Sequence, residues 1–144
     1  MQVRNIGFQK SLLNKVVRLS NRLELEAEND LKVSFGLTFS QFRLIESLSA
    51  TNEITQRELA EYIGVTPAVV TKQAEALVAR GLVLQEINPK SKREKILSLT
   101  AKGERAALDA AKLIRLTQNR VLQSVDLQTE VALSKAIDEV MKNC

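Results

Sequence analysis

The chain has 144 residues, of which 44% are hydrophobic, 3% aromatic and 26% charged, and its formal net charge is +4. A chain of this length folds as one domain-sized unit, and the scarcity of aromatic residues favours a helical core of Leu, Val, Ile and Ala. The weak positive charge is compatible with a polyanionic partner but does not establish one.

Several classes of function lack their chemical parts. The sequence holds no histidine and one cysteine, Cys144, so it offers neither the usual metal ligand and general base nor an intramolecular disulfide. It also lacks a glycine-rich phosphate loop and a nucleophile motif, so we expect no enzyme activity, metal or cofactor. No apolar run reaches the ~20 residues that span a bilayer, and residues 1–10 lack a signal-peptide core. These absences predict a cytoplasmic protein with no membrane partner.

Residues 6–31 are predicted to form a long amphipathic helix. Its apolar positions recur at spacings of three and four and are Phe8, Leu12, Val16, Leu19, Leu23 and Ala27. A basic line on another face is interpreted as solvated rather than membrane-bound, because acidic residues follow one turn later. Residues 33–37 are expected to be a connector in which Gly36 breaks the helix.

A capping box of Thr38 and Gln41 begins the next predicted helix, which extends through about Leu48. Its phenylalanines are interpreted as core residues rather than as a ligand box. Residues 49–53 are expected to be a polar turn, and Ile54 is expected to add a short edge strand to a later hairpin.

Two short helices around a tight turn follow. Thr55 and Glu58 form a second capping box, and Gly64 ends that helix where a positive φ is needed. Thr66 can cap the next helix, with Pro67 at its first helical position. This order of elements is typical of a helix-turn-helix.

The second of these helices is predicted to have two different faces. Val70, Ala74 and Leu77 form an apolar side. The opposite side carries mostly small residues and one lysine, namely Ala68, Lys72, Glu75 and Ala79. Small residues and a cation suit close approach to base edges and phosphates in a major groove. An ordinary solvated helix face is the alternative.

A basic hairpin is predicted after this helix. Residues 82–87 and 95–99 are expected to be its strands, joined by a turn over residues 88–91. Its tip and shoulder carry Lys90, Lys92, Arg93 and Lys95. Next to a candidate recognition helix, such a hairpin could reach phosphates or a minor groove, although most charge runs are simply solvated.

Two further helices complete the chain. Thr100 is expected to start a helix over residues 101–125, and Asp126 to cap a last one. The chain therefore begins and ends with amphipathic helices that a small central unit cannot fully cover. Such stripes predict either an intramolecular bundle or a homodimer interface.

A series of short motifs follows the chain in order: L-T-x-x-Q-F-R-L-I at 37–45, T-Q-R-E-L-A-E at 55–61, V-T-K at 70–72, R-G-L-V at 80–83, the basic hairpin and L-T-A-K-G at 99–103. With this series the sequence resembles the MarR family of bacterial winged-helix regulators. The resemblance implies a mainly α fold with a small β-wing, a winged helix-turn-helix whose long terminal helices form a dimerisation base. The implied divisions are 1–36 for the first dimerisation helix and connector, 37–100 for the DNA-binding domain and 101–144 for the last dimerisation helices.

The implied function is a homodimeric, sequence-specific DNA-binding transcription regulator, a repressor relieved by a small-molecule effector. A two-fold pair of recognition helices predicts a near-palindromic operator in double-stranded DNA. The alternative is a winged-helix module that binds protein without specific DNA binding. We suspect an effector cleft between residues 8–20, 39–48 and 104–116.

The expected DNA-binding residues lie on both helices and on the hairpin. They are Thr55, Gln56, Thr66, Ala68, Val69, Thr71, Lys72, Gln73, Lys90, Lys92, Arg93 and Lys95. Those at 66, 68, 69 and 71 are expected at base edges, and those at 72, 73, 92 and 95 at phosphates. Arg93 is the implied minor-groove residue.

Two positions depart from the family pattern, and a cysteine that some members use to sense oxidants is absent. Ser91 stands where the family's wing usually has an aspartate, so the carboxylate that would brace Arg93 is absent. Lys72 stands where an arginine is common, and it would act as a point charge rather than a bidentate fork. No cysteine lies near the start of the first helix, and the terminal Cys144 is interpreted as incidental rather than as an oxidant sensor.

Overall fold

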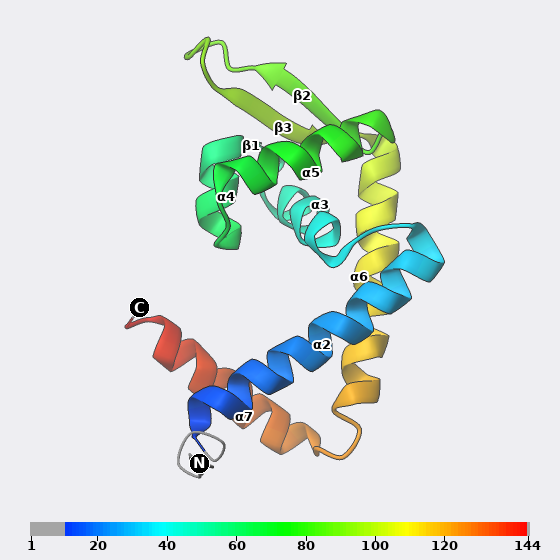
Figure 1. Ribbon diagram of the computed structural model, residues 1–144, viewed down its shortest axis with the longest axis vertical. Helices are drawn as coiled ribbons and strands as arrows, with labels where there is room; N and C mark the ends of the chain where they lie inside the picture. Colours follow the sequence, from blue (N-terminus) through cyan, green and yellow to red (C-terminus); the bar gives the residue numbers. More distant parts are fainter. Residues whose placement is uncertain (1–10, 144) are drawn as a thin grey trace, which may run out of the picture.

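A computed structural model describes residues 11–143 and contains six helices and three strands in that range (Figure 1). In chain order the elements are α2 (Leu12–Phe35), α3 (Phe39–Thr51), β1 (Glu53–Thr55), α4 (Gln56–Ile63), α5 (Pro67–Ala79), β2 (Val83–Ile87), β3 (Lys95–Leu99), α6 (Ala101–Val121) and α7 (Leu127–Met141). Phe8, predicted on the apolar face of the first helix, and Cys144, interpreted as incidental, lie outside the described residues. The mainly α fold with a small β-wing is confirmed.

The elements divide into a lobe and two long supporting helices. The lobe runs from α3 through β3, and α2 and α6 pack against each other beneath it (Figure 1). Helix α3 contacts α2, α4, α5 and α6, which makes it the central element of the lobe. Helix α7 follows α6 after a turn at the end of the molecule away from the lobe (Figure 1).

The first helix is longer at its C-terminal end than the sequence predicted. Residues 33–35 are helical rather than part of a connector, and α2 ends at Gly36, whose φ is +61°. The Gly36 N–H donates to the carbonyls of Leu31 and Lys32, so the left-handed glycine sets the end of the helix. The prediction that Gly36 breaks the helix is confirmed, while the connector was placed too early.

Helix α3 also extends beyond its predicted end near Leu48. It continues through Thr51 and stops at Asn52, which has a φ of +63°. The polar turn predicted over residues 49–53 was wrong, because residues 49–51 are helical and Glu53 begins β1. The hydroxyls of Ser47 and Thr51 donate to the carbonyls four residues earlier, at 2.8 and 3.0 Å. Serine and threonine fit inside a helix when their hydroxyls bond to its backbone in this way. Their presence led to the prediction of a turn here instead of a longer helix.

The three strands form an antiparallel sheet in the order β1-β3-β2. Ile54 pairs with Leu97 on one side of β3, and Gln85 pairs with Leu97 on the other. The predicted short edge strand at Ile54 and the two-stranded hairpin are therefore confirmed, with β2 beginning at Val83 rather than Leu82.

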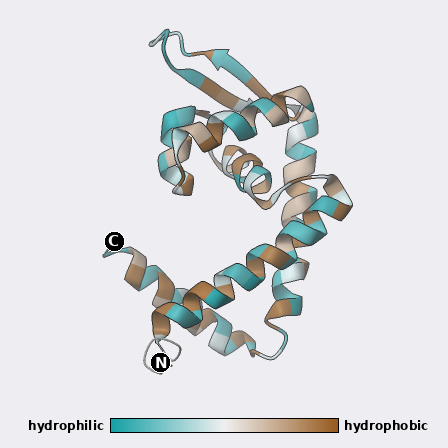
Figure 2. Ribbon diagram, viewed as in Figure 1, coloured by the Kyte–Doolittle hydropathy of each residue, from teal (hydrophilic) through white to brown (hydrophobic). Residues whose placement is uncertain are grey.

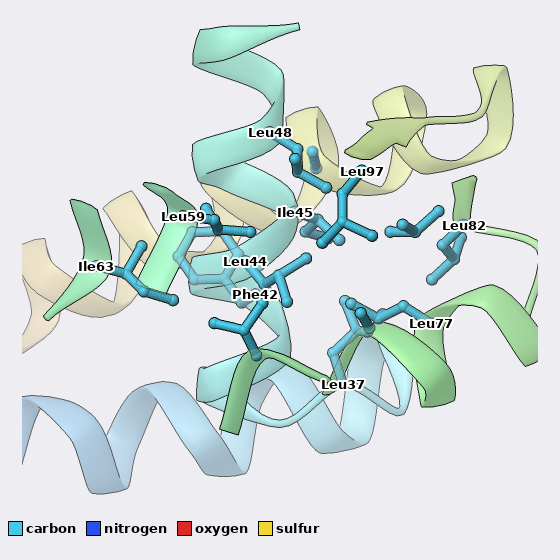
Figure 3. Close-up of a cluster of buried hydrophobic side chains, with 14 of the residues drawn as sticks. Leu37, Phe42, Leu44, Ile45, Leu48, Leu59, Ile63, Leu77, Leu82 and Leu97 are labelled. Carbon is cyan, nitrogen blue, oxygen red and sulfur yellow. The ribbon is translucent and has the colours of Figure 1, made fainter. Parts of the chain in front are cut away.

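The hydrophobic core lies inside the lobe, around α3. Figure 3 shows leucine and isoleucine side chains from α3, α4, α5 and β3 converging there. Apart from alanines, the members with no more than 1% exposure are Leu31, Leu37, Leu44, Ile45, Leu48, Leu59, Val70, Leu77, Val83 and Leu97. Leucine and isoleucine supply most of this volume, as the shortage of aromatic residues predicted.

The start of α6 is packed tightly against residues 81 and 82, which follow α5. The Thr100 hydroxyl accepts from the Gly103 N–H at 2.9 Å, and it also lies 2.7 Å from the Gly81 carbonyl, to which it donates. An added Cβ at Gly103 would lie 2.0 Å from the carbonyl oxygen of Leu82. The L-T-A-K-G sequence thus combines a helix cap with a position where only glycine fits.

The last two helices differ from prediction only at one boundary. Helix α6 ends at Val121, four residues before the predicted end at 125, because residues 122–125 form a turn closed by a 2.8 Å bond from Val125 N–H to the Leu122 carbonyl. Asp126 caps α7 by accepting from the Thr129 N–H at 2.7 Å, as predicted. None of the helices in residues 11–143 combines the length and apolar character needed to cross a membrane.

Candidate nucleic-acid interface

Helix α4 begins and ends as its sequence predicted. The Thr55 hydroxyl accepts from the Glu58 N–H at 3.2 Å, while the Glu58 carboxylate accepts from the Thr55 hydroxyl and N–H at 2.8 and 3.0 Å. The hydroxyl bond and then the backbone bond lower the pKa of Glu58. Gly64 ends the helix with a φ of +69°. Because its hydroxyl is engaged in this cap, the main role of the Thr55 side chain in the structure is to hold the start of α4, and not to offer a free hydroxyl to DNA.

Helix α5 has the two faces that the sequence predicted. Thr66 caps it, Pro67 occupies its first turn, and Val70, Ala74 and Leu77 are fully buried against the lobe. The exposed side carries Ala68, Val69, Lys72, Glu75 and Ala79. The first turn of α5 holds no acidic residue, so the positive end of its dipole is not neutralised there.

Two predicted site residues lie between α4 and α5 rather than on the open face. The Thr71 hydroxyl lies 3.0 Å from the Pro67 carbonyl and 3.2 Å from the Gln56 amide oxygen. Thr71, Gln56 and Gln73 are all half-buried. These contacts hold α4 against α5, so Thr66, Ala68 and Val69 are the more accessible positions on the helix.

Asn88 organises the tip of the wing. Its backbone N–H donates to the Glu94 carbonyl at 2.9 Å, and its side-chain amide donates to the Glu94 carboxylate at 3.1 Å. The N–H groups of Lys90 and Ser91 donate to the side-chain and backbone oxygens of Asn88, both at 3.0 Å. Asn88 is itself buried, so the loop is closed around an internal amide.

Sequence reasoning did not identify Asn88 and Glu94 as a structural pair. An asparagine before a proline between two strands is a recognised turn signal, because its side chain bonds to backbone two residues later. The bond to Glu94 could not be read from that signal. It draws the single acidic residue of the tip inward, while Lys90, Lys92, Arg93 and Lys95 remain exposed.

The wing and α5 belong to one surface of the lobe. Strand β2 packs beside α5, and in Figure 1 the hairpin runs back so that its tip lies toward the side where α5 begins. Within residues 11–143, none of the four exposed wing cations forms a described ion pair. The lobe therefore presents a positive helix terminus together with an uncompensated basic hairpin.

A helix-turn-helix followed by a basic hairpin, whose strands form a small sheet with the strand β1 that precedes the two helices, defines a winged helix-turn-helix protein. The model of the MarR family matches residues 35–94. The transcriptional repressor MdtR of Bacillus subtilis is 30% identical over 113 residues, covering 72% of this chain and 73% of MdtR. The chain belongs to the MarR family and is a transcriptional regulator of that family.

Solved structures agree with the fold. The regulator BldR from Sulfolobus solfataricus superposes with a TM-score of 0.83 at 24% identity and covers 100% of both chains. A mutant MarR from E. coli, complexed with operator DNA, gives a TM-score of 0.83 at 19% identity and covers 97% of this chain and 99% of that one. At these identities the likeness shows the fold alone. The named relatives are transcriptional regulators rather than enzymes.

Proposed function

We propose that the protein is a homodimeric, sequence-specific DNA-binding repressor. The observation that carries the proposal is the two-faced helix α5 beside a basic wing in one lobe, with small exposed residues near the start of the helix. A helix with such a face fits a major groove about 12 Å wide. The E. coli relative bound to operator DNA has the same fold, which supports this use of the lobe.

The proposed roles follow accessibility and charge. Thr66, Ala68 and Val69 read base edges, and Thr71 contributes from its half-buried position. Arg93 enters the minor groove, where a narrow A·T-rich sequence has a stronger negative potential. The remaining cations and amides hold the sugar–phosphate backbone or position α4, and they are Thr55, Gln56, Lys72, Gln73, Lys90, Lys92 and Lys95.

Homodimer formation is supported by apolar surface that one chain leaves uncovered. Helix α7 has no buried residue, and hydrophobic positions recur along it and along the first half of α2 (Figure 2). These side chains are Leu12, Leu13, Val16, Val17, Leu127, Val131, Leu133, Ile137, Val140 and Met141, all at least 44% exposed. An apolar face of this extent is stabilised when a second copy covers it.

Relief of repression by a small molecule is supported by a cleft of about 530 Å³ beneath the lobe. Its walls come from α2, α3, α6 and α7 and include Leu23, Phe39, Arg43, Ile114 and Ile137. The Arg43 guanidinium also donates to the carbonyl of Ile63, the last residue of α4. A ligand that engages Arg43 would therefore act on the helix-turn-helix, and it can shift DNA affinity only by its differential affinity for two arrangements.

Binding-site selection from random duplexes, followed by titration of the selected duplex at several salt concentrations, tests the proposal. We expect a near-palindromic site and an affinity that falls steeply as salt rises, because phosphate neutralisation releases counterions. No enrichment, with binding to other proteins that is insensitive to salt, would instead support the protein-interaction module.

A further inference from the structure

Arg80 stands at the junction between the proposed recognition helix and the long N-terminal helix. It is the residue immediately after α5, and its side chain reaches back to the end of α2. Nη1 donates to the Gly36 carbonyl at 2.9 Å, and Nη2 donates to the Phe35 carbonyl at 2.7 Å. One planar guanidinium thus bridges two consecutive backbone oxygens.

The chemistry of this bridge suits arginine specifically. The last carbonyls of a helix have no partner within the helix and carry the negative end of its dipole, so a cation there is favourable. A guanidinium presents two parallel donors in a fixed plane, whereas a lysine ammonium is a point charge on a flexible stem. The arrangement therefore fixes a direction as well as a distance between α5 and α2.

The backbone of Arg80 is held from a third direction. Lys102, in the first turn of α6, donates to the Arg80 carbonyl at 3.0 Å. Gly81 follows with a φ of +68°, which turns the chain sharply into β2. One residue therefore joins α5, α2 and α6, the element that would read DNA and the two that pack together beneath the lobe.

We infer that Arg80 is a positioning residue that fixes the tilt of α5 relative to α2, and hence the spacing of the two recognition helices in a dimer. The inference rests on the proposed function for its consequence at DNA. At 1.5 Å per residue, α5 is roughly 20 Å long, so a tilt of about 10° about the clamp moves its far end by ~3.5 Å. That displacement is close to the ~3.4 Å between successive base pairs.

The clamp is exposed to solvent, so it contributes little to the free energy of unfolding. Its loss should therefore alter geometry while leaving the fold intact. This separates Arg80 from a residue of the core, whose removal would lower stability and DNA binding together.

The first test measures the tilt without DNA. Nitroxide labels are placed at Asn29→Cys on α2 and Ala68→Cys on α5, both exposed positions, in a Cys144→Ser background. The labelled chain is diluted with unlabelled protein so that only distances within one chain are recorded. We expect a narrow distribution with Arg80 present, a broader or shifted one for Arg80→Gln, and an intermediate one for Arg80→Lys.

The second test measures spacing at DNA. The wild-type chain and the variants are titrated with the selected operator and with operators that have one base pair added or removed at the centre. We expect Arg80→Gln to bind the selected operator five- to tenfold more weakly and to lose most discrimination between spacings, with unchanged affinity for random duplex. Arg105→Gln is the matched control, because it removes an equally charged, exposed arginine of α6 that makes no described side-chain bond within residues 11–143.

The outcomes separate the two proposals. A distance distribution and spacing preference in Arg80→Gln that match wild type would overturn the positioning role while leaving DNA binding intact. A broadened distance distribution in Arg80→Gln, together with a wild-type chain that binds no duplex, would uphold the clamp and reject the proposed function. A melting temperature lowered by more than that of Arg105→Gln would reassign Arg80 to structural stability.

Discussion

The lobe and the terminal helices of this protein use their apolar residues in opposite ways. In the lobe, leucines of α3, α4, α5 and β3 are almost completely buried by other parts of the same chain. In α7 and the first half of α2, comparable residues remain exposed, and Leu127 and Leu12 are each 75% exposed. The apolar residues of the lobe are therefore covered within one chain, with help from Leu31 of α2 and from Ala107 and Ala110 of α6, whereas those of α7 and the first half of α2 remain open in a single chain.

The largest expected effect is on the stability of the lobe, where the apolar side chains are buried. Leu44→Ala removes a side chain that is 1% exposed, and we expect a loss of about 2–5 kcal/mol in the free energy of unfolding from lost burial and an unfilled cavity. Leu133→Ala, at a position 44% exposed in the single chain, is the matched control. Urea denaturation at low protein concentration, where a dimer would dissociate, should separate the two. Equal losses would contradict the contrast between a buried leucine of the lobe and an exposed leucine of α7.

Ile137→Glu addresses the terminal helices. The position is 48% exposed in the single chain, so a charge there should leave the lobe intact but oppose burial against a second copy. We expect at least a hundredfold rise in the dimer dissociation constant, about 2.8 kcal/mol, by analytical ultracentrifugation. Lys135→Glu, an exposed position on the same helix, controls for the added negative charge. An unchanged dissociation constant would remove α7 from the interface.

Gly103→Ala tests the contact between the lobe and α6, one of the two long helices beneath it. An added Cβ would meet the Leu82 backbone carbonyl at 2.0 Å, and a backbone atom cannot turn aside as a flexible side chain can. We expect a loss of about 1–3 kcal/mol in thermal or urea unfolding. Glu104→Ala, one residue later on the exposed side, should change stability far less. A neutral result for Gly103→Ala would mean that α6 can move away from Leu82.

Arg93→Ala tests the wing without disturbing either half of the molecule. Arg93 is exposed, so its removal should leave the melting temperature and the oligomeric state unchanged. We expect specific DNA binding to weaken by about 1–3 kcal/mol at matched salt. Fluorescence anisotropy with the selected operator measures this change, and Arg105→Ala is the control for lost charge. An unaltered affinity would exclude Arg93 from the DNA contact.

The smallest effect concerns the ion cluster that joins α2 to α6. Asp30 accepts from the Thr117 hydroxyl at 2.5 Å and from Arg120 at 2.7 Å, and these bonds lower its pKa. A carboxyl whose pKa is lower in the folded state stabilises the fold above its unfolded pKa of about 3.9 and loses that contribution as the pH falls below it.

Asp30→Asn should therefore be less stable than wild type near pH 7, and this difference should shrink as the pH falls below about 4. Melting temperatures measured across that range test the expectation, with the exposed Asp138→Asn as the control. A difference that stays constant with pH would show that Asp30 contributes through packing rather than through its charge.

The elements that sequence reasoning predicted well have local signals. Capping at Thr38, Thr55, Thr66 and Thr100 depends on side chains within three residues, and all four caps form. The apolar face of α5 follows from helical periodicity, which is also local. The order of the elements and the starts of these capped helices could therefore be predicted before any contact was known, while the fold class as a whole came from the family resemblance.

The features that escaped prediction depend on contacts between distant residues. Arg80 lies 44 positions from Gly36, and Thr117 lies 87 positions from Asp30. Both side chains would be read from the sequence as ordinary solvated groups on a helix. The pairing of Asn88 with Glu94 spans only six positions, yet it depends on the path of the loop rather than on any repeat.

Residues and roles were both predicted for the expected site, but the contacts among its residues were not. The sequence indicated that Thr71 and Gln56 belong to the same surface, while the structure shows them facing each other between α4 and α5. Exposure then separates Thr66, Ala68 and Val69 as the freer positions. A sequence pattern can assign a residue to a helix face, but its neighbours decide whether its polar atoms are free.

The stoichiometry of the complex with the selected operator tests the central claim most directly. Sedimentation velocity of the full chain at micromolar concentration is measured alone and with the duplex in dilute buffer. It gives the oligomeric state of the free protein and the number of chains bound to each duplex. We predict a dimer without DNA and two chains on each operator duplex, with the complex dissociating as salt is added. A monomer that fails to bind any duplex under these conditions would contradict the account.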